Sequence, residues 1–427
     1  MKGLRFNNVI RRAAVLCSLC IMLSVNIAIG QYNNGKDILE NSFRLAEQQY
    51  CNMLKVSKKL NVFPRSTGKD GKIRYTDVAD WTGGFWAGGL WYLYENSGDA
   101  KWKQAAVKWT EALAKGQYNT AHHDVGFVMY CSYGNAWRLT GDPEYKKVLL
   151  QSAESLSSRF NPKVGSIMSW NPRLSWDGKT LWKFPVIIDN MINLELLFYA
   201  SKVSGNPRYS QIAISHAEKV MQNHVRPDYS SYHVINYDPQ TGKVQNKETN
   251  QGFANNSTWA RGQGWGIYGF TMAFRETGDK RFLETACGMA DFYLNHSNLP
   301  ADKVPYWDFN TNQPGYTPVW KYDPAAFSEI PRDASAAAIV SSALFELSTY
   351  SKENQEKYYT AAVDMLRSLS SQNYLAAAGT NNYFILKHSV GSIPHGFEVD
   401  SPLIYADYYF LEALSKYKAS LVTRKKS

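Results

Sequence analysis

The chain has 427 residues, of which 44% are hydrophobic, 20% charged and 14% aromatic. This length allows one large domain or two to three smaller ones, and this composition excludes a wholly disordered protein. The formal net charge is +10, but residues 2–12 supply four of the positive charges and residues 424–426 supply three. Because a nucleic-acid-binding protein concentrates basic residues on its folded domain, we expect no nucleic-acid partner.

The first 30 residues have the pattern of a secretory signal peptide. The basic residues at 2–12 precede an apolar run over 13–29, and Ala28 and Gly30 are small residues at positions −3 and −1 before Gln31. A basic start, a short apolar stretch and small residues at the exit are typical of a cleaved signal. We therefore expect residues 1–30 to be removed and the protein to be exported into a periplasm, with a lipid anchor as the alternative.

Six segments after this leader repeat one order of elements. In the four clearest copies an apolar, aromatic helix ends at a glycine, and an Asp or Asn then starts an amphipathic helix. Glycine favours the left-handed conformation that closes a helix, and Asp or Asn favours the cap that begins the next. The apolar helices must be buried, and the amphipathic helices shield them from water. The closing glycines are Gly98, Gly141, Gly205 and Gly278.

The repeats predict the fold class. Their spacing is irregular, which argues against an open solenoid of regular units. Six hairpins with buried inner helices instead indicate an all-α, closed (α/α)6 barrel with few short strands in its loops; strand signals occur at 232–238 and 382–387. We expect a single catalytic domain over residues 31–420, followed by a basic tail at 421–427.

The most unusual residues of the chain lie directly before the inner helices. In a closed barrel the N-termini of all inner helices point to one end, so these segments should converge on one cavity. They span residues 81–86, 122–127, 187–191, 259–265 and 400–403.

Asp124 and Asp189 are the acidic candidates in these segments. Each could simply cap a helix, as we expect of Asp333 and Asp400. Asp189, however, lies between two apolar stretches, and a buried carboxylate must become protonated or find a partner. A carboxylic acid beside a second carboxylate is one way in which proteins make a general acid near neutral pH. The residue pattern leaves open whether Asp189 is a cap or this acid.

Arg261 and Gln263 lie among three glycines and between Trp259 and Trp265. An arginine presents a planar fork that matches a carboxylate, and a tryptophan face suits the apolar side of a sugar ring. We expect this segment to bind substrate. His233 could be an ordinary histidine of a surface strand.

At these residues the sequence resembles a known family. The motifs WTGGFW, DVGF, IIDNMINLELL and STWARGQGWGIYGF are similar to those of the unsaturated glucuronyl hydrolases of glycoside hydrolase family 88, from about residue 40 to 418. The resemblance implies removal of a 4,5-unsaturated uronic acid from lyase-generated oligosaccharides, such as glycosaminoglycan disaccharides, by hydration of the vinyl ether. It implies that Asp189 is the proton donor and that Asp124 is the second carboxylate.

The resemblance also implies a set of pocket residues. Some relatives bind sulfate through a cluster of Ser and Lys residues in the last loop. This chain departs from that pattern, because Pro394 stands at the position of the lysine. The residues expected to contact substrate, Gln263 included, are Trp81 or Trp86, Trp170, His233, Gln251, Trp259, Arg261, Gln263, Trp265 and Tyr408.

Two alternatives remain open at this point. An unsaturated rhamnogalacturonyl hydrolase of pectin breakdown would share the fold, and a non-catalytic helical glycan-binding protein would keep the aromatic residues without needing the carboxylate pair. We expect no metal or other cofactor, because the adjacent residues His122, His123 and Asp124 rarely face one ion together. The sequence implies no stable protein partner.

Overall fold

The computed structural model describes residues 35–424. The expected signal peptide therefore lies outside the described residues. Of the expected basic tail, residues 421–424 continue the last helix, and 425–427 are not described.

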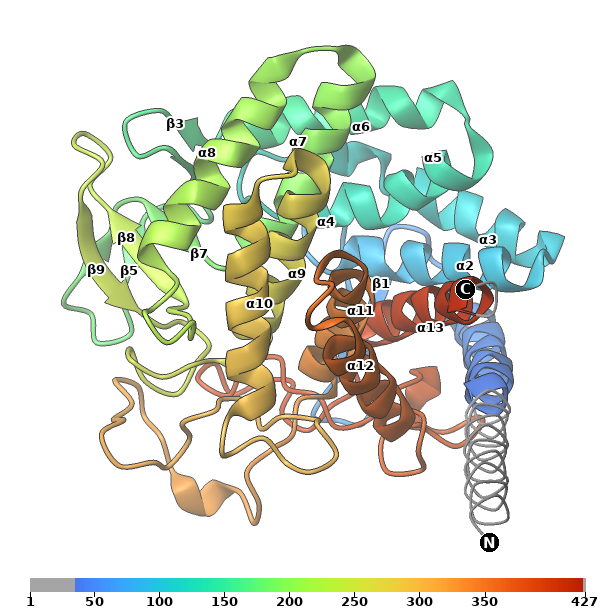
Figure 1. The fold of residues 1–427 in the computed structure, drawn as a ribbon. Helices are drawn as coiled ribbons and strands as arrows, with labels where there is room; N and C mark the ends of the chain where they lie inside the picture. The colour runs from blue at the N-terminus through green and yellow to red at the C-terminus, as the bar shows by residue number, and fades with distance from the viewer. Residues whose placement is uncertain (1–34, 425–427) are drawn as a thin grey trace, which may run out of the picture.

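The inner ring of the fold consists of six helical elements, whose α-helices are labelled in Figure 1. Each contacts the next in chain order, and the last returns to contact the first. This arrangement confirms the predicted (α/α)6 barrel. The inner elements are α2 (Gly83–Ser97), the continuous α4 (Val125–Met129), η2 (Tyr130–Gly134) and α5 (Asn135–Thr140), α7 (Asn190–Ser204), α9 (Ala260–Thr277), α11 (Ala334–Tyr350) and α13 (Ile404–Arg424).

The outer ring is formed by the amphipathic helices. The turns between inner and outer helices are as predicted: the four closing glycines are left-handed, with φ between 69° and 71°. The following Asp99, Asp142, Asn206 and Asp279 each accept a backbone N–H two residues on. The outer helices are α3 (Ala100–Glu111), α6 (Pro143–Ser157), α8 (Pro207–Asn223), α10 (Lys280–Asn295) and α12 (Gln355–Leu369).

The sixth outer position is filled from the other end of the chain. Residues 35–56 are helical, and the ring of Tyr50 lies 4.6 Å from that of Trp86 in α2. A Cβ on Gly35 would meet the hydroxyl of Tyr417 in α13. The repeat pattern did not identify this helix as the partner of α13, because the two segments of that hairpin are separated by almost the whole chain.

Short antiparallel strands lie within the loops. One sheet has the order β7 (Pro185–Ile187), β8 (Val234–Tyr237) and β9 (Val244–Glu248), with Ile187 opposite Val234 and Val234 opposite Glu248. The strand expected at 232–238 is therefore present as β8, whereas 382–387 forms no named strand. The hairpins are β1 (Phe63–Thr67) with β2 (Ile73–Thr76), β3 (Phe160–Asn161) with β4 (Ser166–Ile167), and β5 (Arg173–Leu174) with β6 (Leu181–Trp182).

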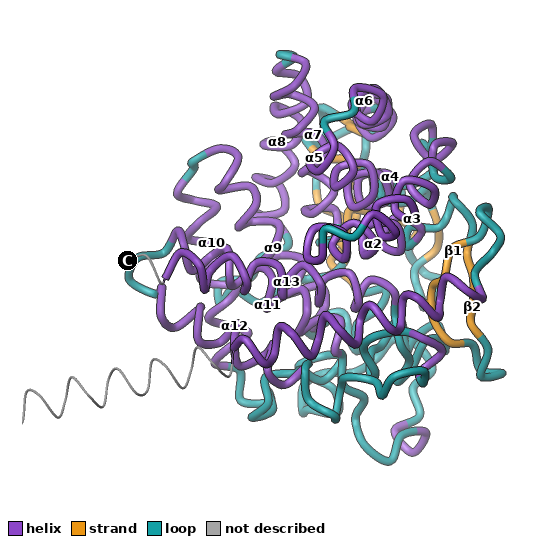
Figure 2. Tube along the Cα trace, turned by 90° about the vertical axis from the view of Figure 1, so that its right-hand side faces the viewer, coloured by secondary structure: helices purple, strands orange, loops and turns teal. Residues whose placement is uncertain are grey.

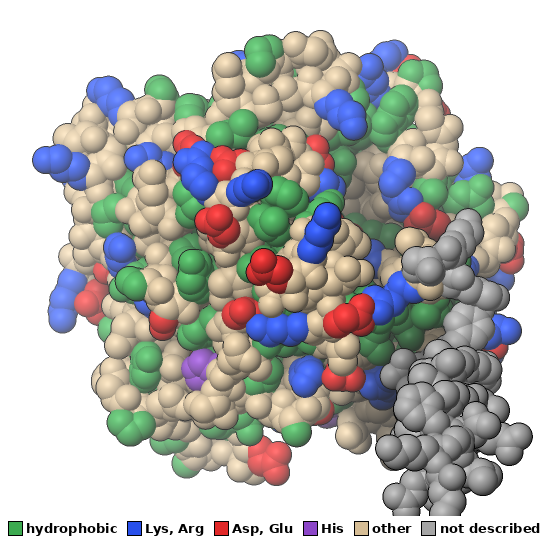
Figure 3. All heavy atoms as spheres, viewed as in Figure 1, with side chains coloured by type: hydrophobic (Ala, Val, Ile, Leu, Met, Phe, Trp, Pro, Cys, Tyr) green, Lys and Arg blue, Asp and Glu red, His purple; other side chains and the backbone are tan. Residues whose placement is uncertain are grey.

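Figure 2 shows many of the loops below the helices, and the β1–β2 hairpin, which precedes α2, at their right-hand side. On the face shown in Figure 3, basic and acidic side chains are interspersed over the surface. Within residues 35–424, no helix has the length and hydropathy needed to cross a bilayer.

Candidate active site

Asp124, Asp189 and Asp333 all occupy the residue before an inner helix, but they use their carboxylates differently. The side chain of Asp333 accepts the backbone N–H of Ser335, which is the expected capping role. Within the described chain, neither Asp124 nor Asp189 makes a capping hydrogen bond with its side chain. Their carboxylates are therefore free for another task at the same end of the barrel.

Asp189 is a buried acid with an elevated pKa. It follows the buried strand β7, whose pairing with β8 carries it to the mouth of the barrel. Burial raises the pKa of Asp189 to about 7, with the charge of Arg261 opposing this rise and that of Asp124 adding to it. No residue in the described part of the chain hydrogen-bonds to its Oδ2. A carboxyl group with this pKa is protonated in about half of the molecules at pH 7, and in more of them at lower pH, and it can donate that proton.

His233 faces Asp189 in a defined tautomer. Its Nδ1 accepts the backbone N–H groups of Asn250 and Gln251, both at 3.1 Å. Burial lowers the pKa of His233 well below its usual value, so the ring is neutral and its single proton must lie on Nε2. Nε2 is 3.6 Å from Oδ2 of Asp189. A small movement would let His233 donate to the Asp189 carboxylate once that group has lost its proton.

Asp124 has the opposite electrostatic environment. Its Oδ2 lies 3.2 Å from Nδ1 of His122, and its Oδ1 lies 3.2 Å from Nε2 of His123. Burial alone would raise the pKa of Asp124, but the charge interactions with His123 and His122 outweigh burial and lower it. Asp124 is therefore ionised at a pH at which Asp189 is still protonated. The sequence drew attention to the two histidines only as doubtful metal ligands.

Among residues 35–424, no group of three or more His, Cys, Asp or Glu side chains is arranged to hold a metal ion.

Aromatic rings surround these acids. The ring of Trp259 lies 4.6 Å from that of His233, and the ring of Trp170 lies 6.4 Å from it. On the side of Asp124, Phe127 packs 5.4 Å from Trp265 and 6.2 Å from Trp81. The structure thus places four of the expected aromatic residues around the two acids. Trp81 and Trp170 are partly exposed and can stack on a sugar ring, whereas Trp259 and Trp265 are buried.

Gln251 also lies at this site. Besides donating its backbone N–H to His233, it donates from Nε2 to the carbonyl of Gly391 at 3.3 Å. It therefore connects His233 to the last loop, residues 388–401.

Arg261 does not present the open fork that its sequence context suggested. Its Nη1 donates to Oδ2 of Asp333 at 2.8 Å and also to the carbonyl of Val390, and its Nη2 donates to the carbonyl of Gly391 at 2.7 Å. The side chain is 1% exposed. Arg261 therefore anchors the last loop and places a positive charge near Asp189.

Gln263 and Trp86 are turned away from the site. The Nε2 of Gln263 donates to the carbonyls of Tyr229 and Met289, and its Oε1 accepts from Ser231. With donors and acceptor engaged inside the protein, this side chain has a structural role. Trp86 is fully buried between α2 and the outer helices, so Trp81 is the tryptophan of this segment that belongs to the site.

Tyr408, a residue expected from the sequence to contact substrate, lies away from the two acids. Its hydroxyl accepts from Asn135 at 3.2 Å, deeper in the barrel. The tyrosine of α13 at the site is Tyr405, whose ring lies 4.8 Å from Trp81 and 5.3 Å from the guanidinium of Arg261. Because α13 begins at Ile404, only its first turn reaches the mouth of the barrel. The sequence did not reveal this first residue of the helix, which would have pointed to Tyr405.

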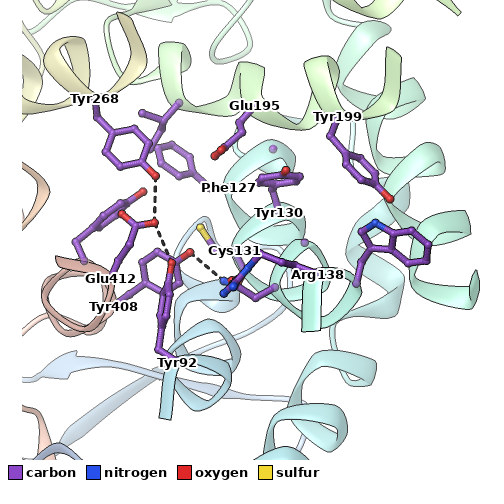
Figure 4. Close-up of a pocket in the computed structure, with 16 residues that line it drawn as sticks. Tyr92, Phe127, Tyr130, Cys131, Arg138, Glu195, Tyr199, Tyr268, Tyr408 and Glu412 are labelled. Atoms are coloured by element: carbon purple, nitrogen blue, oxygen red, sulfur yellow. Dashed lines mark hydrogen bonds between the residues drawn. The ribbon is translucent and has the colours of Figure 1, made fainter. Parts of the chain in front are cut away.

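Tyr408 lines a separate cavity of about 330 Å³ inside the inner ring (Figure 4). The hydroxyls of Tyr92 and Tyr268 both point to Oε1 of Glu412, at 2.9 and 3.1 Å. Ser342 donates to the other oxygen of this carboxylate. Glu412 is thus bonded to three hydroxyl groups of the barrel interior, whereas the hydroxyl of Tyr199, which also lines the cavity, has no hydrogen-bond partner among the described residues.

Comparison with known proteins identifies one family of enzymes with similar sequence and structure. The model of Glycosyl Hydrolase Family 88 matches residues 55–304. An unsaturated glucuronyl hydrolase of Formosa agariphila is 46% identical over 85% of this chain and 86% of that protein. An unsaturated chondroitin disaccharide hydrolase of Streptococcus agalactiae is 35% identical over 80% of this chain and 82% of that protein. The crystal structure of a heparin-specific unsaturated glucuronyl hydrolase superposes with a TM-score of 0.83 at 46% identity, covering 92% of this chain and 98% of that one.

Proposed function

The chain belongs to glycosyl hydrolase family 88, and we propose on this basis that it is an unsaturated glucuronyl hydrolase. Its reaction removes a 4,5-unsaturated uronic acid from the non-reducing end of an oligosaccharide that a polysaccharide lyase has produced. We propose glycosaminoglycan-derived disaccharides as substrates. The relatives compared above, an unsaturated glucuronyl hydrolase and an unsaturated chondroitin disaccharide hydrolase, each align with at least 80% of this chain. Family membership makes the protein an enzyme and sets the glycan-binding alternative aside.

One observation carries the proposal: two carboxylates at one site have pKa values moved in opposite directions. Asp189 has a pKa of about 7 and can donate a proton, whereas the pKa of Asp124 is lowered and its carboxylate stays charged. Such a pair provides an acid and an anion at the same pH. A protein that only bound glycans would have no need of it.

The proposed chemistry begins with proton transfer. The Asp189 carboxyl group donates its proton to C4 of the unsaturated uronic acid. The π electrons of the C4=C5 bond form the new C–H bond, which leaves a positive charge shared by C5 and the ring oxygen. Water adds to C5 and gives its proton to the Asp189 carboxylate, which restores the acid. The hemiketal then opens to a ketone at C5, and the hemiacetal left at C1 expels the second sugar. One water molecule is consumed.

The neighbouring residues support each charge in turn. The ionised Asp124 would stabilise the positive charge at C5 and accept hydrogen bonds from ring hydroxyls. His233 would donate from Nε2 to Asp189 while that carboxylate is charged. The rings of Trp81 and Trp170 would hold the sugar and exclude water from its faces.

Replacement of the acid tests the proposal. Asp189→Asn cannot deliver a proton, so we expect turnover to fall by about 10²–10⁴-fold or more while substrate still binds. The loss of ultraviolet absorbance of the unsaturated uronate measures turnover, and chondroitin, hyaluronan, heparin and pectin fragments made by lyases rank the substrates.

A matched control is Asp142→Asn, which keeps a good cap at the start of the outer helix α6 and should leave activity unchanged. Wild-type turnover in Asp189→Asn would refute the role of this carboxyl group. Activity on the pectin fragments alone would replace glycosaminoglycans with rhamnogalacturonan as the substrate class.

A further inference from the structure

Arg173 is a cation at the active-site end that pairs with no carboxylate of the described residues. It lies in β5, and its guanidinium carbon is 5.0 Å from the ring of Trp170 and 5.5 Å from that of Trp182. Among residues 35–424, no carboxylate lies within ion-pair distance of it, and burial lowers the pKa of Arg173 without any acidic group to offset the shift. Its neighbours differ in this respect, because Arg65 pairs with Glu398 and Arg261 pairs with Asp333.

Arg173 is connected to the candidate catalytic aspartate through Asn250 and His233. Its Nη2 donates to Oδ1 of Asn250 at 2.5 Å, and the backbone N–H of Asn250 donates to Nδ1 of His233. His233 in turn faces Asp189 at 3.6 Å. This chain of contacts places the guanidinium on the wall of the site that Trp170 forms.

A second aromatic pair extends this wall. Trp176 donates from Nε1 to the carbonyl of Asn250 at 2.9 Å, and its ring lies 4.6 Å from the ring of His395 in the last loop. Arg173 is close enough to contribute to the lowered pKa of His395, although burial is the larger cause. The hairpin and the last loop therefore meet beside Arg173.

The guanidinium retains most of its hydrogen-bonding capacity. An arginine has five N–H donors, and the contact with Asn250 uses one of them. The residue is exposed, and its guanidinium lies within cation–π distance of two indole rings. Its planar fork matches the geometry of an oxyanion. The last loop, residues 388–401, contains no Lys or Arg, and its Ser392 is bonded to His395 at 2.6 Å. The other arginine of the wall, Arg261, is already engaged.

We propose that Arg173 binds an anionic group of the substrate and thereby determines specificity. The group is either the carboxylate of the unsaturated uronic acid or a sulfate ester on the sugar next to it, since both are oxyanions that accept two parallel N–H bonds. This inference rests on the proposed function and names a specificity residue for the same site. Arg173 acts in binding and takes no part in the proton transfer.

The experiment compares Arg173→Gln and Arg173→Lys with the wild type on matched unsulfated and sulfated unsaturated disaccharides. Loss of a charge-assisted hydrogen-bonded contact should raise KM by roughly 10- to 100-fold in Arg173→Gln, with kcat changed only a few-fold. Arg173→Lys should recover part of the affinity, because a point charge replaces the fork. Thermal unfolding confirms that both variants remain folded.

Lys179→Gln is the matched control. It removes one positive charge from the turn of the same hairpin, where the lysine side chain is 82% exposed, and should leave KM unchanged.

Each outcome has one interpretation. An equal rise in KM on both substrates assigns the uronate carboxylate, and a rise on the sulfated substrate alone assigns the sulfate. If the wild type is active and Arg173→Gln has the same KM as the wild type on both substrates, the inference is overturned. Arg173 then has only a structural role in the hairpin. A wild type that consumes none of the disaccharides overturns the proposed function and this inference with it.

Discussion

At the scale of single residues, the candidate active site contains two aspartates made chemically different by their surroundings. Both precede an inner helix, and both are largely buried. Asp124 has a histidine against each carboxylate oxygen, whereas Oδ2 of Asp189 has only a histidine at 3.6 Å. The sequence predicted the apolar setting of Asp189 but not the partners of Asp124 or the tautomer of His233, because these depend on contacts between separate loops.

The pH dependence of activity follows from these shifts. Asp189 must be protonated, so kcat/KM should fall about tenfold per pH unit as the pH rises through about 7. Asp124 must be ionised, so the acid limb should lie below its ordinary value of 3.8. A pH profile of absorbance loss measures both limbs. A basic limb unchanged from about pH 5 to 9 would contradict the assignment.

The same shift has a consequence for stability. The folded pKa of about 7 exceeds the ordinary value of 3.8, so the folded state keeps a proton that the unfolded state has lost between these values. Stability contributed by the protonated group is present at about pH 4 and is lost as the pH rises through about 7. Asp189→Asn should therefore be more stable than the wild type at about pH 8, by at most about 4 kcal/mol, and the difference should vanish near pH 4.

At the scale of elements, the last loop is held against the start of the chain by a buried ion pair. Arg65 in β1 binds Glu398 through two contacts, Nε to Oε1 at 2.7 Å and Nη2 to Oε2 at 3.1 Å. Ser66 adds a hydrogen bond to Oε1 at 2.7 Å. Glu398 itself has a left-handed backbone, with φ of 54°, which these contacts help to hold. The loop that carries His395 thus depends on residues more than 300 positions away.

Glu398→Gln should weaken this attachment strongly. The substitution removes one of the two carboxylates that pair with the buried Arg65 and leaves Asp80 as its anionic partner. The expected loss in the free energy of unfolding is about 1.5–3 kcal/mol, as for a hydrogen bond to a charged group. Glu154→Gln is the control, because Glu154 makes a similar two-contact pair with Arg208 but both side chains are 50% exposed. An exposed pair contributes about 0–1 kcal/mol. Denaturant unfolding of the two variants compares them, and equal losses would contradict the structural role of Glu398.

At the scale of the whole molecule, the barrel closes because its inner helices approach closely at small residues. Gly84 in α2 faces the backbone of α4, where an added Cβ would lie 2.1 Å from the carbonyl oxygen of Val128. Backbone atoms of a helix cannot move aside as a side chain can. Small residues at such positions allow the six inner helices to form one ring.

Gly84→Ala should therefore destabilise the barrel by at least about 1–3 kcal/mol. Its neighbour Gly83 provides a control within the same helix: its added Cβ would meet the Cδ2 of Leu113 at 3.3 Å, a side-chain atom that can shift. Gly83→Ala should be neutral or slightly stabilising, because alanine favours the helix. Thermal unfolding measures both, and a tolerated Gly84→Ala would show that α2 and α4 have room to separate.

The pairing of Asp124 with Asp189 was suggested by the family resemblance. The sequence by itself determined the alternation of buried and shielding helices, the turns between them and the end of the barrel at which the unusual residues meet. These features depend on local patterns: helical periodicity, turn residues and helix order. Only the tertiary structure decided which polar side chains remain available. Arg261 and Gln263 look equally suited to a ligand in the sequence, yet both are engaged by segments distant in the chain, while Arg173 has no such anionic partner among residues 35–424. Hydrogen bonds and ion pairs between distant segments set these differences, and local sequence patterns do not specify them.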